Sequence, residues 1–373
     1  MSADAAGAVG PALAAAAPAD AAVVARPAFT LAPYAAARRD AYLALLREAW
    51  GPAAMSGAEF DWWFAANPAG SLMSVAEIDG RVVGAAAHSL ARLAVGGEQA
   101  LGQFSVHATT DRSARGLGIF QALELRHELQ GAERGSRLVL AFASAPTAPL
   151  FAGPLGWTAI DRRRVWLRPL AGAAQRLAGR GGVTGRGGVT GRRGLALRRA
   201  TAGDAPGLAP ARGSEWRIAG VEVRRVERFG AAADAAYRAA APGLGNHVVR
   251  DAAYLNWRFL DSPRGYRAFA SPGGFAVVGH KLMRGVSLAV VTECVAPPRE
   301  ARALLRRCIA EARGAEAVAV VPPAGLSRAV LAALGFVPSH IALDFMGKAL
   351  PGAPPLDARP EGWRVSLGDT DFF

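Results

Sequence analysis

Two stretches of this chain repeat one another, and the repeat restricts the possible folds more than any other feature. Residues 255–265 align without gaps on residues 60–70 and match them at a Trp, a Phe, a Pro and a Gly. At the same offset of 195 residues, Val-Val-Gly at 277–279 falls on Val-Val-Gly at 82–84. Self-similarity of this kind is typical of a structural unit that occurs more than once. We therefore expect two copies of one domain, and 373 residues are enough for both.

A glycine-containing turn joins a predicted strand to a predicted helix in the first copy. Residues 99–109 have the pattern of a strand, and the apolar spacing over residues 119–125 is helical. Between them stands Arg-Gly-Leu-Gly at 115–118. Glycine lets the backbone turn tightly, and the first N–H groups of a helix have no partner within the helix, so this turn suits a pyrophosphate. An ordinary structural turn is the alternative that these residues alone leave open.

An apolar run at residues 138–143 follows the helix and is typical of a strand covered on both faces. Strand, helix and parallel strand form a right-handed unit, which places the glycine turn at the carboxyl end of its strand, where ligands bind in open α/β sheets. The predicted fold class is α/β (α+β), with two tandem domains that have mixed, partly parallel sheets. A further strand near residues 163–167 is expected to close the first domain.

The corresponding turn of the second copy has no glycine. It reads Ala-Pro-Pro-Arg at 296–299, between a predicted strand at 287–293 and a predicted helix that starts near residue 299. Each proline removes an N–H that a phosphate would need. We therefore expect the first copy to hold the ligand and the second copy to be degenerate.

The cysteines and the N-terminal segment exclude several classes of protein. Cys294 and Cys308 form no CxxC spacing, which argues against a disulfide scaffold and a structural zinc site, and we expect no metal. No apolar run has membrane-spanning length. Residues 1–28 are mostly alanine, with no basic residue before Arg26, and so lack the positive start of a signal peptide. We expect a disordered tail at 1–28 and a cytoplasmic protein.

The net charge of +13 raises the question of nucleic-acid binding, but its distribution argues against it. Sixteen arginines and five acidic residues lie within residues 161–228, so most of the excess is concentrated there. Within residues 171–200 the unit Gly-Arg-Gly-Gly-Val-Thr occurs twice in tandem, and we interpret this segment as a flexible Gly/Arg-rich linker. Contact of the linker with nucleic acid remains an alternative to a solvated tether.

These motifs together resemble the GNAT N-acetyltransferase superfamily. The resemblance rests on the glycine turn after a strand, on Leu123 in the following helix, and on Leu-Gly-Trp at 155–157 and Leu-Gly-Phe at 334–336 after later short helices. The Trp…Pro-x-Gly segments, the tandem layout and the tail at 363–371 are similar to those of bacterial double-GNAT proteins related to the Eis group.

The resemblance divides the chain and implies a reaction. It implies an acyl-CoA-binding domain at 29–170, a degenerate GNAT-like domain at 201–350 and a C-terminal tail at 351–373. The implied activity is transfer of an acetyl or similar acyl group from acetyl-CoA to a primary amine of a small molecule or peptide, by direct attack. A catalytically silent binding or scaffold protein with the same fold is the alternative, and the oligomeric state stays open.

The resemblance also implies which residues hold the cofactor. Backbone amides of the glycine turn would bind the pyrophosphate of acetyl-CoA, and the preceding strand would lie beside its pantetheine arm. The residues that this implies are Val106, His107, Ala108, Arg115, Gly116, Leu117, Gly118, Ile119 and Phe120.

The catalytic groups are less clear from the sequence. Where many relatives have a tyrosine as general acid, this chain has Ala152 in the first copy. His107 is a candidate base, because imidazole titrates in the useful range; a hydrogen-bonded core histidine is the alternative. A second candidate set follows from the resemblance, since Eis-type enzymes bring their C-terminus into the active site, whereas a solvated tail is the alternative. That set consists of Asp369, Asp371 and the terminal carboxylate of Phe373.

Three large side chains of the repeat are expected to be structural. Trp62 and Trp257 occupy equivalent positions, and each is expected to anchor a helix against the sheet of its own domain. Arg258 is expected to pair with Asp251 or Asp261 as a clamp, without a catalytic role.

Overall fold

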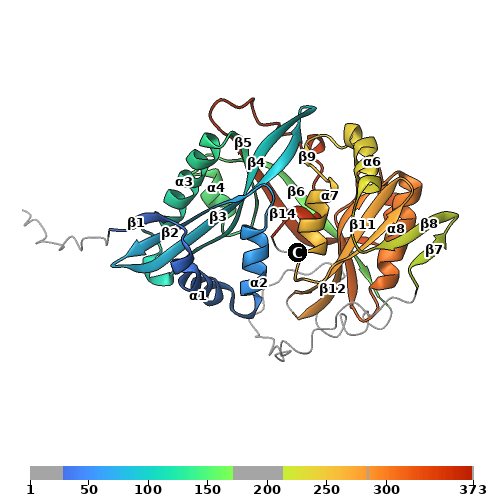
Figure 1. The fold of residues 1–373 in the computed structure, drawn as a ribbon, viewed down its shortest axis with the longest axis horizontal. Helices are drawn as coiled ribbons and strands as arrows, with labels where there is room; N and C mark the ends of the chain where they lie inside the picture. Colours follow the sequence, from blue (N-terminus) through green and yellow to red (C-terminus); the bar gives the residue numbers. More distant parts are fainter. Residues whose placement is uncertain (1–27, 171–212, 284, 372–373) are drawn as a thin grey trace, which may run out of the picture.

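The computed structural model describes residues 28–170, 213–283 and 285–371 (Figure 1). The predicted linker at 171–200, nearly all of the predicted tail at 1–28, and Phe373 lie outside these residues. Within the described part, no helix is long and apolar enough to cross a membrane.

The first half of the described chain contributes six strands and four α-helices. The strands are β1 (Thr30–Pro33), β2 (Ser71–Ile78), β3 (Arg81–Val95), β4 (Glu98–Thr110), β5 (Ser136–Ala143) and β6 (Thr158–Pro169). The helices are α1 (Arg39–Trp50), α2 (Gly57–Phe60), α3 (Ile119–Glu133) and α4 (Ala148–Ala152). β2, β3 and β4 are antiparallel, β5 is parallel to β4, and α3 connects these last two, as the apolar patterns predict.

The second half has the same order of elements around its own parallel pair. Its strands are β7 (Glu215–Ile218), β8 (Val221–Val226), β9 (His247–Val248), β10 (Arg267–Ser271), β11 (Gly274–Met283), β12 (Val286–Val295), β13 (Ala317–Val320) and β14 (Val337–Ala349). Its helices are α6 (Ala231–Ala240), α7 (Ala252–Leu255), α8 (Pro298–Glu311) and α9 (Arg328–Ala333). β12 and β13 are parallel and α8 connects them. The predicted mixed α/β class is confirmed.

The two halves form one continuous sheet because they exchange strands. The order is β1-β2-β3-β4-β5-β14-β6-β13-β12-β11-β10-β8-β7, and β9 pairs with β3. The strand expected near residues 163–167 is present as β6, but it pairs with β13 and β14, while β14 pairs with β5. Gly347 allows β14 to lie here, since a Cβ on it would be 2.7 Å from a methyl group of Leu140. A strand from each half therefore completes the sheet of the other.

Trp62 and Trp257 also join the two halves. The indole N–H of Trp62 donates to the carbonyl of Trp257 over 2.6 Å, and the indole N–H of Trp257 donates to the carbonyl of Trp62 over 3.0 Å. Both lie in π-helical turns, at Asp61–Ala65 and Asn256–Leu260. The expectation that each anchors a helix within its own domain missed this reciprocal contact, which relates the two repeated segments across the interface.

The C-terminal tail is part of the core that the two halves share. Trp363, Val365 and Leu367 are buried in the hydrophobic cluster that also contains Tyr42 from α1 and Leu288 from β12. The side chains of Asp369 and Asp371 are 3% and 15% exposed, so the solvated tail that stood as the alternative for these two residues is wrong.

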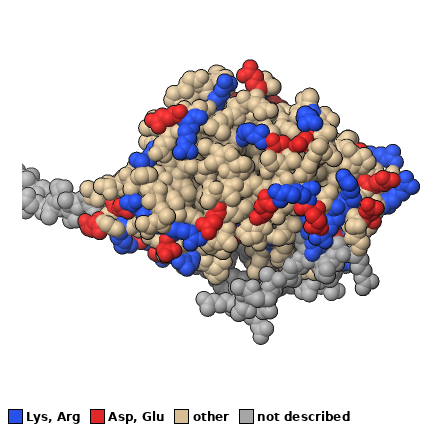
Figure 2. Space-filling model, viewed as in Figure 1, with Lys and Arg blue, Asp and Glu red and all other residues tan. Residues whose placement is uncertain are grey.

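Positively and negatively charged side chains lie next to one another on the face of the molecule that Figure 2 shows. In Figure 2 the positive and negative side chains are interspersed over both halves, so the net positive charge does not form a patch of one sign on this face.

Candidate functional site

The turn between β4 and α3 has the backbone geometry of an anion cradle. Gly116 and Gly118 have φ of 80° and 84°, a left-handed conformation that favours glycine. The first helical bond of α3 runs from the N–H of Ala122 to the carbonyl of Gly118. The N–H groups of residues 119–121 therefore lie at the open, positive end of a helix of four turns.

Packing holds the first turn of α3 in place beneath this cradle. Ile119 is buried against β3, where Gly84 leaves the room: a Cβ on Gly84 would lie 2.4 Å from a methyl group of Ile119. The ring of Phe120 packs edge-on against Phe151 of α4, with 5.3 Å between the ring centroids. Arg115 is exposed, so its charge is available at the mouth of the turn.

The turn that occupies the same place in the second half is much shorter. Residues 296–297 alone separate β12 from α8, whereas residues 111–118 separate β4 from α3. Pro297 is the N-cap residue and Pro298 the first helical residue of α8, so neither supplies an N–H at this helix end. Only the turn of the first half presents backbone donors in a glycine loop.

A β-bulge in β4 directs His107 toward the interface between the halves. Val106 pairs with Ala87 and Thr109 with Ala85, so β4 has one residue more than β3 in this interval. His107 takes up the excess with a φ of 51°. Its ring lies edge-on to three aromatic rings, those of Trp63 and Phe64 in the shared core and that of the exposed Trp50, at 5.9 to 6.2 Å between centroids.

His107 faces a carboxylate of the tail. Its Nε2 lies 3.8 Å from Oδ2 of Asp371, and the two side chains are 13% and 15% exposed. This Nε2 is buried and has no hydrogen-bond partner among the described residues. Burial lowers the pKa of His107 below its usual value, and the carboxylate of Asp371 opposes that effect. The imidazole is therefore neutral near pH 7 and can accept a proton.

Further charged groups surround His107 and Asp371, and the sequence did not identify them as site residues. Arg264 donates to Glu59 over 2.7 Å, which joins the second half to α2 of the first. Lys281 on β11 is half-buried, and desolvation lowers its pKa. Arg264 occupies the position of Ala69 in the repeat, between the matching Pro and Gly, so a charged residue at this position in one copy alone was the available signal.

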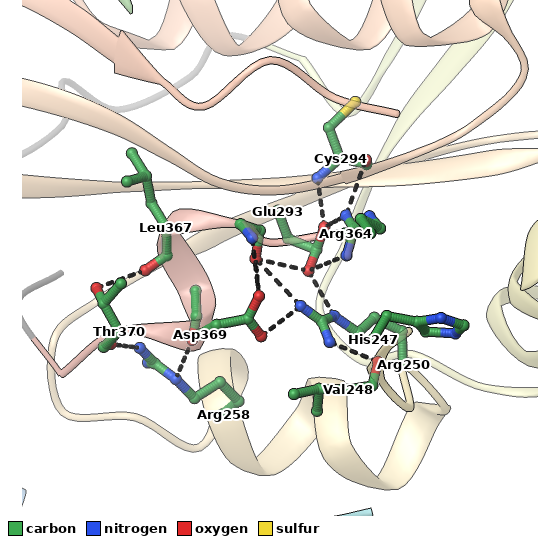
Figure 3. A network of polar contacts seen from close by, with 12 residues as sticks. His247, Val248, Arg250, Arg258, Glu293, Cys294, Arg364, Leu367, Asp369 and Thr370 are labelled. Carbon is green, nitrogen blue, oxygen red and sulfur yellow. Dashed lines mark hydrogen bonds and ion pairs between the residues drawn. The ribbon is translucent and has the colours of Figure 1, made fainter. Parts of the chain in front are cut away.

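Asp369 lies in a different environment from Asp371. Its carboxylate accepts from Nη2 of Arg250 over 2.5 Å, and Arg250 also donates through Nε to Glu293 over 2.7 Å (Figure 3). Arg364 bonds to the other oxygen of Glu293. Burial by itself would raise the pKa of Glu293, but Arg364 and Arg250 lower it to about 2. This network fixes the tail against β12.

Arg258 holds the tail on its other side. It donates to the carbonyls of Gly368 and Thr370, each over 3.0 Å (Figure 3). The expected acidic partners bond elsewhere, because Asp251 pairs with Arg92 and Asp261 with Arg228. The clamp that the sequence predicts is present, but it acts on backbone carbonyls.

The predicted site residues thus fall into groups. His107 and Asp371 lie side by side, Asp369 lies in the arginine network, and Phe373 is outside the described residues. The predicted cofactor-binding residues form the end of β4, the turn and the start of α3; these are Val106, His107, Ala108, Arg115, Gly116, Leu117, Gly118, Ile119 and Phe120.

Cys294 and Cys308 are free and buried in the hydrophobic core of the second half. Burial raises the pKa of the Cys294 thiol to about 12. Within residues 28–170, 213–283 and 285–371, no group of three or more His, Cys, Asp or Glu side chains could hold a metal ion.

Comparison with known proteins identifies the fold of this chain. No protein-family model matches the sequence, and no curated protein sequence does so either. Solved structures do match. A GCN5-related N-acetyltransferase from Kribbella flavida has 16% identity and a TM-score of 0.54, with 88% of this chain and 73% of that chain covered. The chain has the fold of the GCN5-related N-acetyltransferases (GNATs).

Two more structures extend this result. A GCN5-related N-acetyltransferase from Anabaena variabilis has 13% identity and a TM-score of 0.55, covering 87% of this chain and 73% of its own. Eis1 from Mycobacterium abscessus has 13% identity and a TM-score of 0.52, covering 87% and 74%. The predicted resemblance to the GNAT fold of the Eis type is confirmed. At these identities the likeness concerns the fold, and the chemistry depends on the residues of the site.

Proposed function

We propose that this protein transfers an acetyl or similar acyl group from acetyl-CoA to a primary amine. The observation that carries the proposal is the difference between the two halves, since one GNAT-like turn is a glycine cradle and the other is closed by prolines. The cradle is suited to a pyrophosphate, because N–H groups without a helical partner lie at the start of α3 and the preceding turn carries the exposed Arg115. On this proposal the halves are two copies of one domain, within 29–170 and 201–350.

The chemistry that we propose uses His107 as the general base. Acetyl-CoA supplies the acyl thioester when bound. The acceptor amine must be neutral to attack the carbonyl carbon, and its excess proton must leave as the C–N bond forms and the C–S bond breaks. Because burial lowers its pKa, the imidazole of His107 is neutral near neutral pH, and one of its two ring nitrogens can take up that proton. Asp371 then stabilises the imidazolium from 3.8 Å.

The second half has a defined part in this proposal. Arg264 and Lys281 bring its charges to the surroundings of His107, and the tail brings Asp371. The acceptor would therefore bind at the junction of the two halves, whereas the cofactor would bind within the first.

Calorimetric titration with acetyl-CoA tests the binding step. We expect saturable heat that free coenzyme A competes away. Arg115→Glu should weaken binding roughly 10- to 100-fold, because a hydrogen bond to a charged group contributes about 1.5–3 kcal/mol. Arg299→Glu makes the same charge change at the exposed start of α8, and we expect it to leave binding unchanged. Absence of heat, or equal effects of the two substitutions, would contradict the proposal.

Release of free thiol from acetyl-CoA in the presence of a panel of amines tests the transfer step. We expect thiol release that depends on both the amine and His107. Saturable binding of acetyl-CoA without thiol release for any amine would instead favour a silent binding protein with the same fold.

A further inference from the structure

We propose that Arg258 is a positioning residue: it holds the tail so that Asp371 faces His107. This inference rests on the proposed function in that it assigns Arg258 a part in the same site. Arg258 belongs to the π-helical turn Asn256–Leu260 of the second half. On this inference, a residue of the second half positions a group that acts on His107 of the first half.

The contacts of the guanidinium define this task. Arg258 is 1% exposed, and it bonds through Nε to the carbonyl of Gly368 and through Nη2 to the carbonyl of Thr370. In Figure 3 the fork of Arg258 reaches the short helical turn that carries Asp369. The second of these carbonyls directly precedes Asp371 in the chain. The bond to Thr370 therefore fixes the backbone from which the Asp371 side chain extends.

The same guanidinium also lies against the aromatic wall behind His107. Its central carbon is 4.6 Å from the ring centroid of Trp63, and that ring is 6.2 Å from the ring of His107. Arginine stacks well on an aromatic face because its charge is delocalised over a plane. Arg258 thus contacts a neighbour of each member of the His107–Asp371 pair. These neighbours are Thr370, which precedes Asp371 in the chain, and Trp63, whose ring contacts that of His107.

The repeat shows why an arginine is required at this position. Arg258 is the counterpart of Trp63, at the same offset of 195 residues that relates Trp257 to Trp62. Indole offers a single N–H donor, whereas guanidinium offers five in a fixed plane. Two carbonyls of the tail need two donors of fixed geometry, and a tryptophan could serve one of them. The two copies therefore differ where the tail is held.

Replacement of Arg258 should leave the rest of the tail in place. Asp369 is held independently by Arg250, and Leu367 is completely buried in the shared core. The backbone position that would no longer be fixed is that of the last described residues, Thr370 and Asp371. This separation allows the positioning role to be measured apart from folding.

The charged groups around His107 determine the sign of the expected effect. Asp371 faces it from the tail, Glu59 from α2, and Arg264 and Lys281 from the second half. Asp371 is the one among them attached to the segment that Arg258 holds. Its carboxylate favours the imidazolium, so displacement of Asp371 should move the titration of His107 to lower pH.

The test is an NMR titration of the His107 imidazole in the full-length protein without ligand. Arg258→Met and Asp371→Asn should both shift its midpoint to lower pH, and the double variant should shift it no further than Asp371→Asn alone. Arg258→Lys keeps the charge and loses the fork, and it should also shift the midpoint. A wild-type midpoint in Arg258→Met and Arg258→Lys, together with a shifted one in Asp371→Asn, would overturn the inference.

A matched control comes from another arginine of the second half. Arg307 lies 3.8 Å above the ring of Trp216 and pairs with Glu311, with no recorded contact to the tail among the described residues. Arg307→Met removes a stacked, largely buried guanidinium and should destabilise the fold without moving the His107 midpoint. If it moves the midpoint as far as Arg258→Met does, the effect is a general loss of packing and the inference is wrong.

Kinetics give a second measurement. With an accepted amine, Arg258→Met should lower kcat about 10- to 100-fold, as misplacement of a catalytic group by about 1 Å does, and leave KM for acetyl-CoA unchanged. A raised KM with unchanged kcat would contradict positioning. If no amine is accepted, the proposed function fails, and the NMR titration still decides the role of Arg258.

Discussion

Substitution of Glu293 by Gln tests the network that anchors the tail. Glu293 lies on β12 and is 1% exposed. It accepts from Arg250 over 2.7 Å, from Ser366 over 3.2 Å and from Arg364. Gln keeps the shape of the side chain and removes its charge. Arg250 would then keep Asp369 as a carboxylate partner, whereas the buried Arg364 would keep its bond to the carbonyl of Cys294.

The pKa of Glu293 sets the expected magnitude. Although burial acts against it, the two arginines lower this pKa from 4.5 to about 2. At 1.36 kcal/mol per pH unit, the charged form contributes about 3 kcal/mol to stability. Because the pKa is depressed in the folded state, this contribution is present above pH 4.5 and is lost as the pH falls toward 2. Removal of one partner from a buried pair generally costs about 3–5 kcal/mol, so the two arguments agree.

Urea unfolding at pH 7, followed by tryptophan fluorescence, measures the effect. We expect Glu293→Gln to lower the free energy of unfolding by about 3 kcal/mol with little change in the slope against urea. The difference from wild type should shrink as the pH falls from 5 to 3. Glu227→Gln is the matched control, because Glu227 also pairs with an arginine but its side chain is 81% exposed, and we expect about 0.5 kcal/mol or less. Equal unfolding midpoints for Glu293→Gln and wild type would refute the reasoning.

Three other substitutions have specific expected outcomes. Gly84→Val should destabilise the protein by about 1–3 kcal/mol in urea and weaken acetyl-CoA binding, because its side chain would displace Ile119 at the start of α3; unchanged binding would contradict this. His107→Gln should lower kcat about 100-fold or more and remove the acidic limb of its pH profile, which we expect below pH 6.5; a retained limb would exclude His107 as the base. Trp257→Phe should cost about 1–3 kcal/mol in urea, since the carbonyl of Trp62 loses its donor, and a neutral result would show that the reciprocal pair is dispensable.

Local patterns in the sequence were sufficient for the parts of the fold that depend on neighbouring residues. Strand periodicity, helical spacing and two glycines predict β4, the cradle and α3, because φ preferences and hydrogen bonding at a helix end act over a few residues. The prolines at 297 and 298 likewise predict that the corresponding turn of the second half has no such cradle, because neither has an N–H group. The repeat predicts that the same order of elements occurs again.

Strand pairing between the halves, the register of β3 and β4, and the burial of the tail depend on contacts between distant segments, and only the tertiary structure shows them. The sequence of β6 is that of a strand, but its pairing with β13 and β14 depends on competition between edges that come together in the folded chain. The bulge at His107 depends on the register between β3 and β4, and the burial of the tail depends on the groove that the two halves form. The sequence therefore determined the glycine turn, the proposed cofactor end of the candidate site, because it is local. The proposed acceptor end depends on the packing of His107, Asp371 and Arg258 from three distant segments.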